Sequence, residues 1–140
     1  MISSASNEKV KHVAALNKKA SLREDEGVFV AEGVRLFEEI PLSDIKEADF
    51  TEEGLAGLKQ RGHSDPDILL RDGRADMVSL PVMEKMSDVV TPQGVLAVVK
   101  RRTHSWEELL PEGKAPLLIM LRLPPFISLR QITFPFDGSM

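Results

Sequence analysis

The apolar run Val95–Val99 constrains the fold of this chain more than any other segment. Five apolar residues in succession leave no polar face, so a strand here must be covered by other elements on both sides. Pro92, Gln93 and Gly94 form a corner immediately before the run, and Lys100 follows it. The run therefore predicts a central strand in a layered α/β domain, with a turn at one end and cations at the other.

Helical and strand patterns alternate along the rest of the first hundred residues. Apolar spacing predicts helices over 7–19, 34–40, 51–60 and 82–87, and short β-rich runs predict strands over 27–31, 43–50, 68–70, 77–81 and 94–100. Pro41 ends the second helix, and Thr51 is a candidate N-cap for the third. This alternation predicts an α/β domain over about 1–100.

Charge is distributed unevenly along a chain whose net charge is −4. Residues 1–23 hold five cations and one acid, whereas residues 24–53 hold eleven acids and two cations. Lys100, Arg101 and Arg102 form a second basic cluster. A polyanion responds to a local patch rather than to the total charge, so these clusters are either solvated faces or contacts for nucleic acid.

Several function classes are not indicated by the sequence. Cysteine is absent, which excludes disulfides and thiolate sites and fits a cytoplasmic protein. No apolar stretch is long enough to cross a membrane, and the N-terminus carries no signal-peptide pattern. No phosphate-loop, dinucleotide or zinc-protease motif occurs. We therefore expect no catalytic residue, no metal site and no membrane partner in this chain.

Two corners carry polar residues next to predicted strand ends. Glu32 ends one strand, and Gly33 and Arg35 open the following helix. Glu32 could cap the free amides of that helix, or it could meet a ligand together with Arg35. The second corner holds Gln93, whose amide can hydrogen-bond a base or a ribose hydroxyl, and Gly94, whose plain role is to shape the turn.

These residues resemble a known family in their order and approximate spacing. The family pattern is S-x-x-N-x-x-[VI]-K, then F-x-x-E-G-x-[RK]-L, then S-x-x-x-T-P-Q-G before an apolar strand. The matching residues are Ser4, Asn7, Val10 and Lys11; Phe29, Glu32, Gly33, Arg35 and Leu36; and Ser87, Thr91, Pro92, Gln93 and Gly94. Over about residues 2–121 the chain is similar to the N-terminal part of SpoU-type RNA ribose 2′-O-methyltransferases.

The resemblance implies a fold and a partner. It implies a small three-layer α/β/α domain with a mixed sheet, similar to ribosomal proteins that bind kinked RNA. This domain would deliver structured RNA, either rRNA or tRNA, to a separate knotted domain that binds S-adenosylmethionine and transfers the methyl group. The implied boundaries are 1–102 for the RNA substrate-binding domain, 103–115 for a linker, and 116–140 for a remnant strand of the methyltransferase domain and an aberrant tail.

The residues after Leu121 depart from the family pattern. No Asn occurs after residue 17, and the glycine-rich cofactor loops do not follow. We therefore expect a chain that holds no cofactor and is inactive alone, with a shifted reading frame or early stop after about residue 121. Two alternatives remain: an active methyltransferase completed by a partner chain, and a protein-interaction module without RNA. The apolar tail could also self-associate.

The predicted RNA contacts combine the matching motifs with the basic clusters. Cations would contact phosphates and position the RNA, and its shape would supply specificity. The affinity should fall as salt rises. The predicted RNA-binding residues are Asn7, Lys11, Lys18, Lys19, Arg23, Glu32, Arg35, Ser87, Thr91, Gln93, Gly94, Lys100, Arg101 and Arg102.

Overall fold

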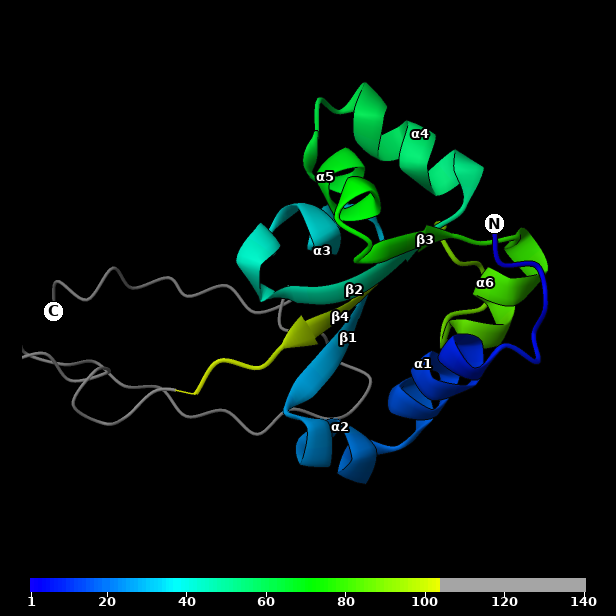
Figure 1. Cartoon of the computed structure of the whole chain (residues 1–140), viewed down its shortest axis with the longest axis vertical. Helices are drawn as coiled ribbons and strands as arrows, with labels where there is room; N and C mark the ends of the chain where they lie inside the picture. Colours follow the sequence, from blue (N-terminus) through cyan, green and yellow to red (C-terminus); the bar gives the residue numbers. More distant parts are fainter. Residues whose placement is uncertain (104–140) are drawn as a thin grey trace, which may run out of the picture. The chain divides into compact units, whose positions relative to one another are not determined.

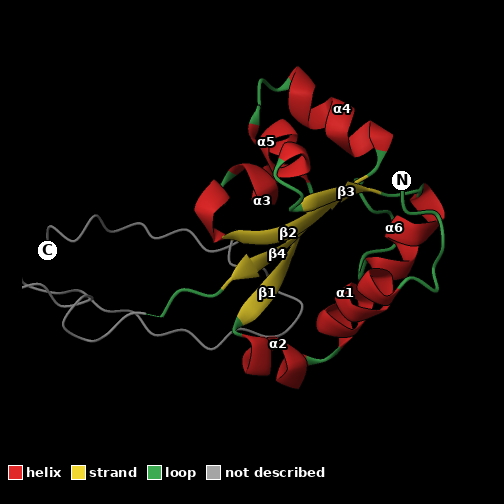
Figure 2. Ribbon diagram, viewed as in Figure 1, coloured by secondary structure: helices red, strands yellow, loops and turns green. Residues whose placement is uncertain are grey.

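A computed structural model describes residues 1–103 of the chain (Figures 1 and 2). Its elements are α1 (Glu8–Lys18), α2 (Ala20–Glu26), β1 (Val28–Glu32), α3 (Val34–Glu38), the 3-10 turn η1 (Leu42–Asp44), β2 (Ile45–Phe50), α4 (Glu52–Gln60), α5 (Asp65–Arg71), β3 (Ala75–Met77), α6 (Leu80–Met86) and β4 (Val95–Lys100). All lie in the first of two units, Met1–Arg101. From residue 104 onward, the expected linker, remnant strand and self-associating tail lie outside the described residues.

The strands form one mixed sheet in the order β1-β4-β2-β3. β4 runs antiparallel to β1 and β2, whereas β2 and β3 are parallel. Val95–Val99 are all buried in β4, the position that the apolar run predicted. The predicted α/β class and mixed sheet are confirmed.

Helices cover both faces of this sheet (Figure 1). One buried cluster joins Ala31, Ile45, Ala48, Phe50, Val95, Ala97 and Val99 of the strands to α3, α4 and α5. Its aromatic contact is Phe37 against Phe50, edge to face, with ring centroids 5.5 Å apart. The other cluster packs Val28, Leu96 and Val98 against α1 and α6. The result is a three-layer α/β/α domain.

The structure confirms the elements whose pattern was periodic. The predicted helices over 7–19, 34–40 and 51–60 and the strands over 27–31, 43–50 and 94–100 match α1, α3, α4, β1, β2 and β4. Asn7 and Thr51 cap their helices, accepting from the backbone N–H groups of Lys9 and Gly54 respectively. Short polar side chains at these positions satisfy amides that have no partner within the helix.

Two expectations about short segments were wrong, and one helix was missed. Residues 68–70 belong to α5 instead of a strand, and residues 77–81 contain the end of β3 and the start of α6. In both helices a proline, Pro66 or Pro81, lies in the first turn, where its missing N–H costs no hydrogen bond. The segment Ala20–Glu26 forms α2, which buries no residue and therefore has no apolar period to reveal it.

Candidate functional site

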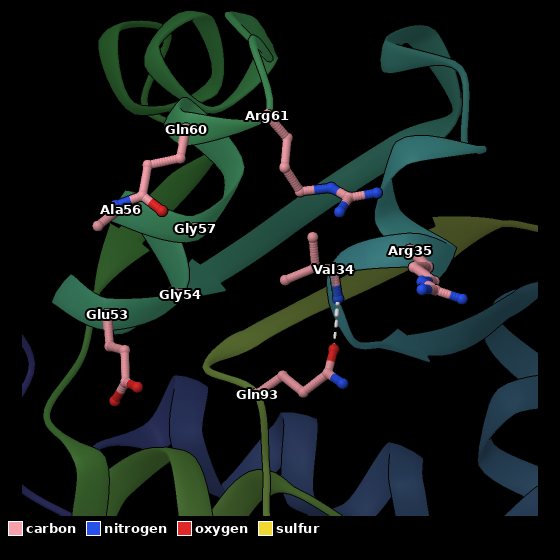
Figure 3. A pocket seen from close by; sticks show the side chains of 9 residues that line it. All are labelled: Val34, Arg35, Glu53, Gly54, Ala56, Gly57, Gln60, Arg61 and Gln93. Carbon is pink, nitrogen blue, oxygen red and sulfur yellow. Dashed lines mark hydrogen bonds between the residues drawn. The ribbon is translucent and has the colours of Figure 1, made fainter.

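The turn before β4 is bound to the turn after β1. Gly33 N–H donates to the carbonyl of Val95 at 2.9 Å, and Val34 N–H donates to Oε1 of Gln93 at 2.9 Å (Figure 3). Gln93 thus satisfies a free amide at the start of α3 from 59 residues away. Because Val34 N–H is a donor, the amide oxygen of Gln93 faces it and the amino group points the other way.

Glu32 fixes the other end of the same loop. Its Oε1 accepts from the hydroxyl of Ser87, and its Oε2 accepts from Asp88 N–H at 3.0 Å and from Asn17 Nδ2 at 3.1 Å. Asn17 Nδ2 also donates to the carbonyl of Met86 at 2.8 Å. The interpretation of Glu32 as the cap of α3 was wrong, because Gln93 supplies that cap and the carboxylate holds the loop that follows α6.

We call Glu32–Val34 together with Ser87–Gly94 the corner. Backbone contacts make its packing tight, since Thr51 N–H donates to the carbonyl of Gly94 at 2.9 Å. A Cβ at Gly54 would lie 2.0 Å from that carbonyl oxygen, and one at Gly94 would lie 2.0 Å from the hydroxyl of Thr51. Gly94 also has φ +79°, a conformation that favours glycine. Both positions therefore require the absence of a side chain.

The middle of the loop projects from these two attachments. Val90 is fully exposed and Val89 is half-exposed, while Thr91 also faces solvent. Two adjacent exposed valines are unusual for a turn, because turn residues are commonly Gly, Pro, Asn, Asp or Ser. The corner therefore presents an apolar tip on a backbone that is fixed at both of its ends.

A row of carboxylates crosses the sheet beside the corner. Glu32 pairs with Leu96 on β4, Leu96 pairs with Asp49 on β2, and Asp49 pairs with Asp76 on β3. α1 contacts this row at two points, through Asn17 at Glu32 and through Lys9 at the two aspartates. The helix is thus attached across the sheet by polar contacts as well as by its apolar face.

Lys9, Asp49 and Asp76 form an ion cluster that the sequence interpretation missed. Lys9 Nζ lies 2.9 Å from Asp49 Oδ1 and 2.5 Å from Asp76 Oδ2. Burial raises the pKa of Asp49 to about 6, and Lys9 only partly offsets this effect. Burial would lower the pKa of Lys9, but the two aspartates together raise it. The sequence placed Lys9 in a basic cluster expected to be a solvated face or a nucleic-acid contact, and its side chain instead faces the sheet.

Several predicted RNA-binding residues come together at the corner. Glu32, Arg35, Ser87, Thr91, Gln93 and Gly94 all lie at the end of the sheet where β1 finishes and β4 begins. The exposed Lys18 and Lys19 follow Asn17, whose side chain touches Glu32. Arg35 lines a cavity together with Gln93. The structure therefore groups the second and third motifs with the end of the basic helix.

The remaining predicted residues lie elsewhere. Lys100 ends β4 and Arg101 and Arg102 follow it, about 20 Å from Gln93 at the rise of a strand. Asn7 caps α1. Lys11 pairs with Glu8 at 3.3 Å, and Arg23 donates to the carbonyls of Leu16 and Asn17 at 2.6 and 3.0 Å. The predicted residues therefore do not form one continuous rim.

A polar cavity of about 670 Å³ opens between α3, α4 and Gln93 (Figure 3). We call it the hollow. Arg61 at its edge donates to both carboxylate oxygens of Glu38, through Nε and through Nη2 at 3.0 Å. This hydrogen bonding lowers the pKa of Glu38 and raises that of Arg61. Sequence reasoning missed the hollow, since no motif connects its walls.

Within residues 1–103, no group of three or more His, Asp or Glu side chains is arranged to hold a metal ion. No helix in the same part of the chain is both long and apolar enough to pass through a bilayer. Two acids, at the corner and at the edge of the hollow, are hydrogen-bonded internally: Glu32 to Ser87 and Glu38 to Arg61.

Solved structures share this three-layer fold. The chain matches an rRNA methyltransferase from Sinorhizobium meliloti with a TM-score of 0.57 and 22% identity, over 74% of this chain and 37% of that one. Its AdoMet-bound form matches with a TM-score of 0.59, 22% identity and coverages of 81% and 41%. An RNA 2′-O ribose methyltransferase matches with a TM-score of 0.55, 23% identity and coverages of 81% and 42%. The chain thus spans about two fifths of these structures.

A family match gives the class of protein that this fold represents, which is a substrate-binding domain. Residues 7–97 match the model of the MRM3-like substrate binding domain. The chain belongs to this family, as the three sequence motifs predicted. No curated protein matches the chain closely enough to add a named relative.

Proposed function

We propose that this domain binds structured RNA, either rRNA or tRNA, and positions it for 2′-O-methylation by a separate catalytic unit. The observation that carries the proposal is the corner, where the second and third family motifs are hydrogen-bonded into one fixed surface. The exposed Lys18, Lys19 and Arg35 lie beside it and supply charge for phosphates. The chain contains no cysteine, which fits the reducing cytoplasm, and we propose that the protein is cytoplasmic.

The proposal includes inactivity of the described domain alone. A general base must be able to accept a proton from a substrate hydroxyl. Two carboxylates here already accept internal hydrogen bonds, Glu32 from Ser87 and Asp88, and Glu38 from Arg61. We therefore assign these groups to shape and binding, and we assign neither methyl transfer nor a site for S-adenosylmethionine to residues 1–103.

Binding to ribosomal RNA tests the first part of this proposal. The chain should retain ribosomal RNA on a filter in dilute buffer, and the affinity should fall steeply between about 50 and 200 mM salt as counterions return to the phosphates. A protein that ignores ribosomal RNA and a tRNA pool at low salt would overturn it. Labelled S-adenosylmethionine in the same mixture tests inactivity, because methyl transfer to the RNA would contradict that part alone.

Protein interaction is a second candidate function, and the exposed valines favour it. Val90 is fully exposed on a loop whose ends are fixed, which is typical of a contact surface. Replacing Val89 and Val90 with serine should leave salt-dependent RNA binding unchanged if the tip contacts protein. A loss of RNA binding in that variant would instead place the tip in the RNA interface.

A further inference from the structure

We infer that the hollow between α3 and α4 receives one unpaired nucleobase of the bound RNA. This inference rests on the proposed RNA-binding function and extends it from a charged surface to a defined site. The hollow's volume of about 670 Å³ lies within the range of small-ligand pockets, roughly 300–1,000 Å³. Its walls come from α3, α4 and the loop before β4, so it borders the corner directly (Figure 3).

The floor of the hollow suits a flat ring. Gly54 and Gly57 lie three residues apart on α4, on the side that faces the hollow (Figure 3). A Cβ at Gly57 would meet no heavy atom within 4 Å, so the space above this residue is open. Ala56 and Val34 add small apolar surface. A planar base could lie against this surface without displacing a side chain.

Arg61 supplies a stacking wall. Glu38 is mostly buried, and it accepts from two nitrogens of the Arg61 guanidinium, which fixes the plane of that group. Guanidinium planes stack on unpaired bases in RNA complexes. Because Glu38 already offsets the charge of Arg61, this wall favours the face of a base over a phosphate.

The polar groups around the hollow suit the edge of a base. Gln93 uses its oxygen for Val34 N–H, which leaves its amino group as a donor, and Gln60 brings a second amide. Glu53 brings a carboxylate that accepts N–H groups but repels phosphate. Arg35 at the edge could bind the phosphate that follows the base. This mixture of donors and acceptors is the chemistry by which unpaired bases are read.

Gly57→Phe is the variant that tests this site. The new ring would occupy the open space above α4, and the absence of any atom near the Cβ position indicates that the fold tolerates it. Gly57→Ala controls for the change in helix propensity while leaving most of the space free. Ser21→Phe on α2 adds the same exposed ring away from the hollow and controls for non-specific stickiness.

The probe is ribosomal RNA cross-linked to the protein with ultraviolet light, with adducts located by mass spectrometry. We expect base adducts on peptides covering residues 54–61, reduced about ten-fold in Gly57→Phe and unchanged in the two controls. Adducts only outside this segment, with RNA still bound, would overturn the base site and leave the proposed function intact. No RNA binding by the wild-type chain would overturn both.

Free nucleotides form a second arm of the experiment. The hollow is open to solvent, so a mononucleotide without flanking phosphate contacts should bind too weakly to compete. A mixture of AMP, GMP, CMP and UMP at millimolar concentration should leave the adducts on residues 54–61 unchanged. Loss of these adducts, with overall RNA retention unchanged, would assign the hollow to free nucleotides and overturn the inference.

Discussion

The two ends of β4 differ in the surface that they present: one is a loop fixed by hydrogen bonds, and the other is a group of exposed cations. At the corner end, Glu32 and Gln93 attach the loop before β4 to the turn after β1, and two glycines bring backbones into contact. At the other end, Lys100 ends the strand and Arg101 follows it. Both are exposed, and Arg101 N–H donates to the carbonyl of Gly27 at 2.8 Å. Fixed shape suits specificity, whereas exposed charge suits affinity.

Paired glycine substitutions give the largest expected difference between these ends. Gly94→Ala places a Cβ 2.0 Å from the hydroxyl of Thr51 at φ +79°, so we expect a loss of about 4 kcal/mol in the free energy of unfolding or a failure to fold. Gly27→Ala at φ +65° meets no atom within 4 Å and should cost only about 1 kcal/mol. Denaturant titration of both variants measures the difference, and equal losses would show that close packing does not distinguish the corner.

The ion cluster beside the corner predicts a pH dependence. The pKa of Asp49 is about 6 in the fold, above its ordinary value of 3.8, so folding favours the protonated form. The stabilisation that this gives is complete below about pH 4 and is lost as the pH rises through 6. Relative to Asp49→Asn, the wild-type chain should therefore lose about 3 kcal/mol of stability between about pH 4 and 7.

Urea unfolding of the two proteins across this pH range measures that difference. Asn keeps the shape of Asp49 but does not titrate, so the difference between the curves isolates this carboxylate from the other acids. Parallel curves would mean that Lys9 fully compensates the buried charge of Asp49. Such a result would contradict the raised pKa of Asp49 in the fold.

Glu32→Gln tests the attachment of the loop itself. An amide can keep one or two of the contacts to Ser87, Asp88 and Asn17, but it loses the charge that strengthens them. We expect a loss of about 2 kcal/mol in unfolding free energy and weaker binding of ribosomal RNA at every salt concentration. Glu84→Gln, on the exposed surface of α6, should change either quantity little.

One result would contradict the role of Glu32 in holding the loop. Glu32→Gln would then bind RNA more weakly, but with unchanged stability and unchanged hydrogen exchange in the loop. Hydrogen exchange of the amides in residues 87–93 supplies that readout, because a released loop exposes Asp88 N–H to solvent. A direct contact between Glu32 and RNA would lower affinity without this exchange. If Glu32 only positions the loop, RNA affinity falls and hydrogen exchange of the loop rises together.

Sequence reasoning found the corner but not the way it is built. The order of the motifs identified Glu32, Gln93 and Gly94 as important, and the apolar run located β4. Glu32 is bonded to Ser87, 55 positions away, and Gln93 to Val34, 59 positions away, and no local pattern carries such pairings. The same holds for Lys9, whose neighbours in the sequence suggested a solvated helix face and whose partners lie on β2 and β3.

Prolines caused the errors in secondary structure. The strand predicted over 77–81 ended at Pro81, and no helix was predicted around Pro66, although each proline lies in the first turn of a helix. Both interpretations treat proline as a terminator, whereas in the first helical turn its fixed φ is already helical. The acids beside Pro66, Asp65 and Asp67, were a usable signal, since acidic side chains stabilise a helix start. Nothing comparable marked α2.

The cationic end gives the smallest expected effect on folding and the clearest effect on salt dependence. Replacing Lys100 and Arg101 with glutamine should leave unfolding free energy within about 0.5 kcal/mol, because both side chains are exposed. If each contacts one phosphate, the slope of log affinity against log salt should become shallower by about 1.5. Filter binding of ribosomal RNA over a salt series measures this slope. An unchanged slope would confine RNA to the corner end, whereas a loss of stability would show that the cations hold the fold as well.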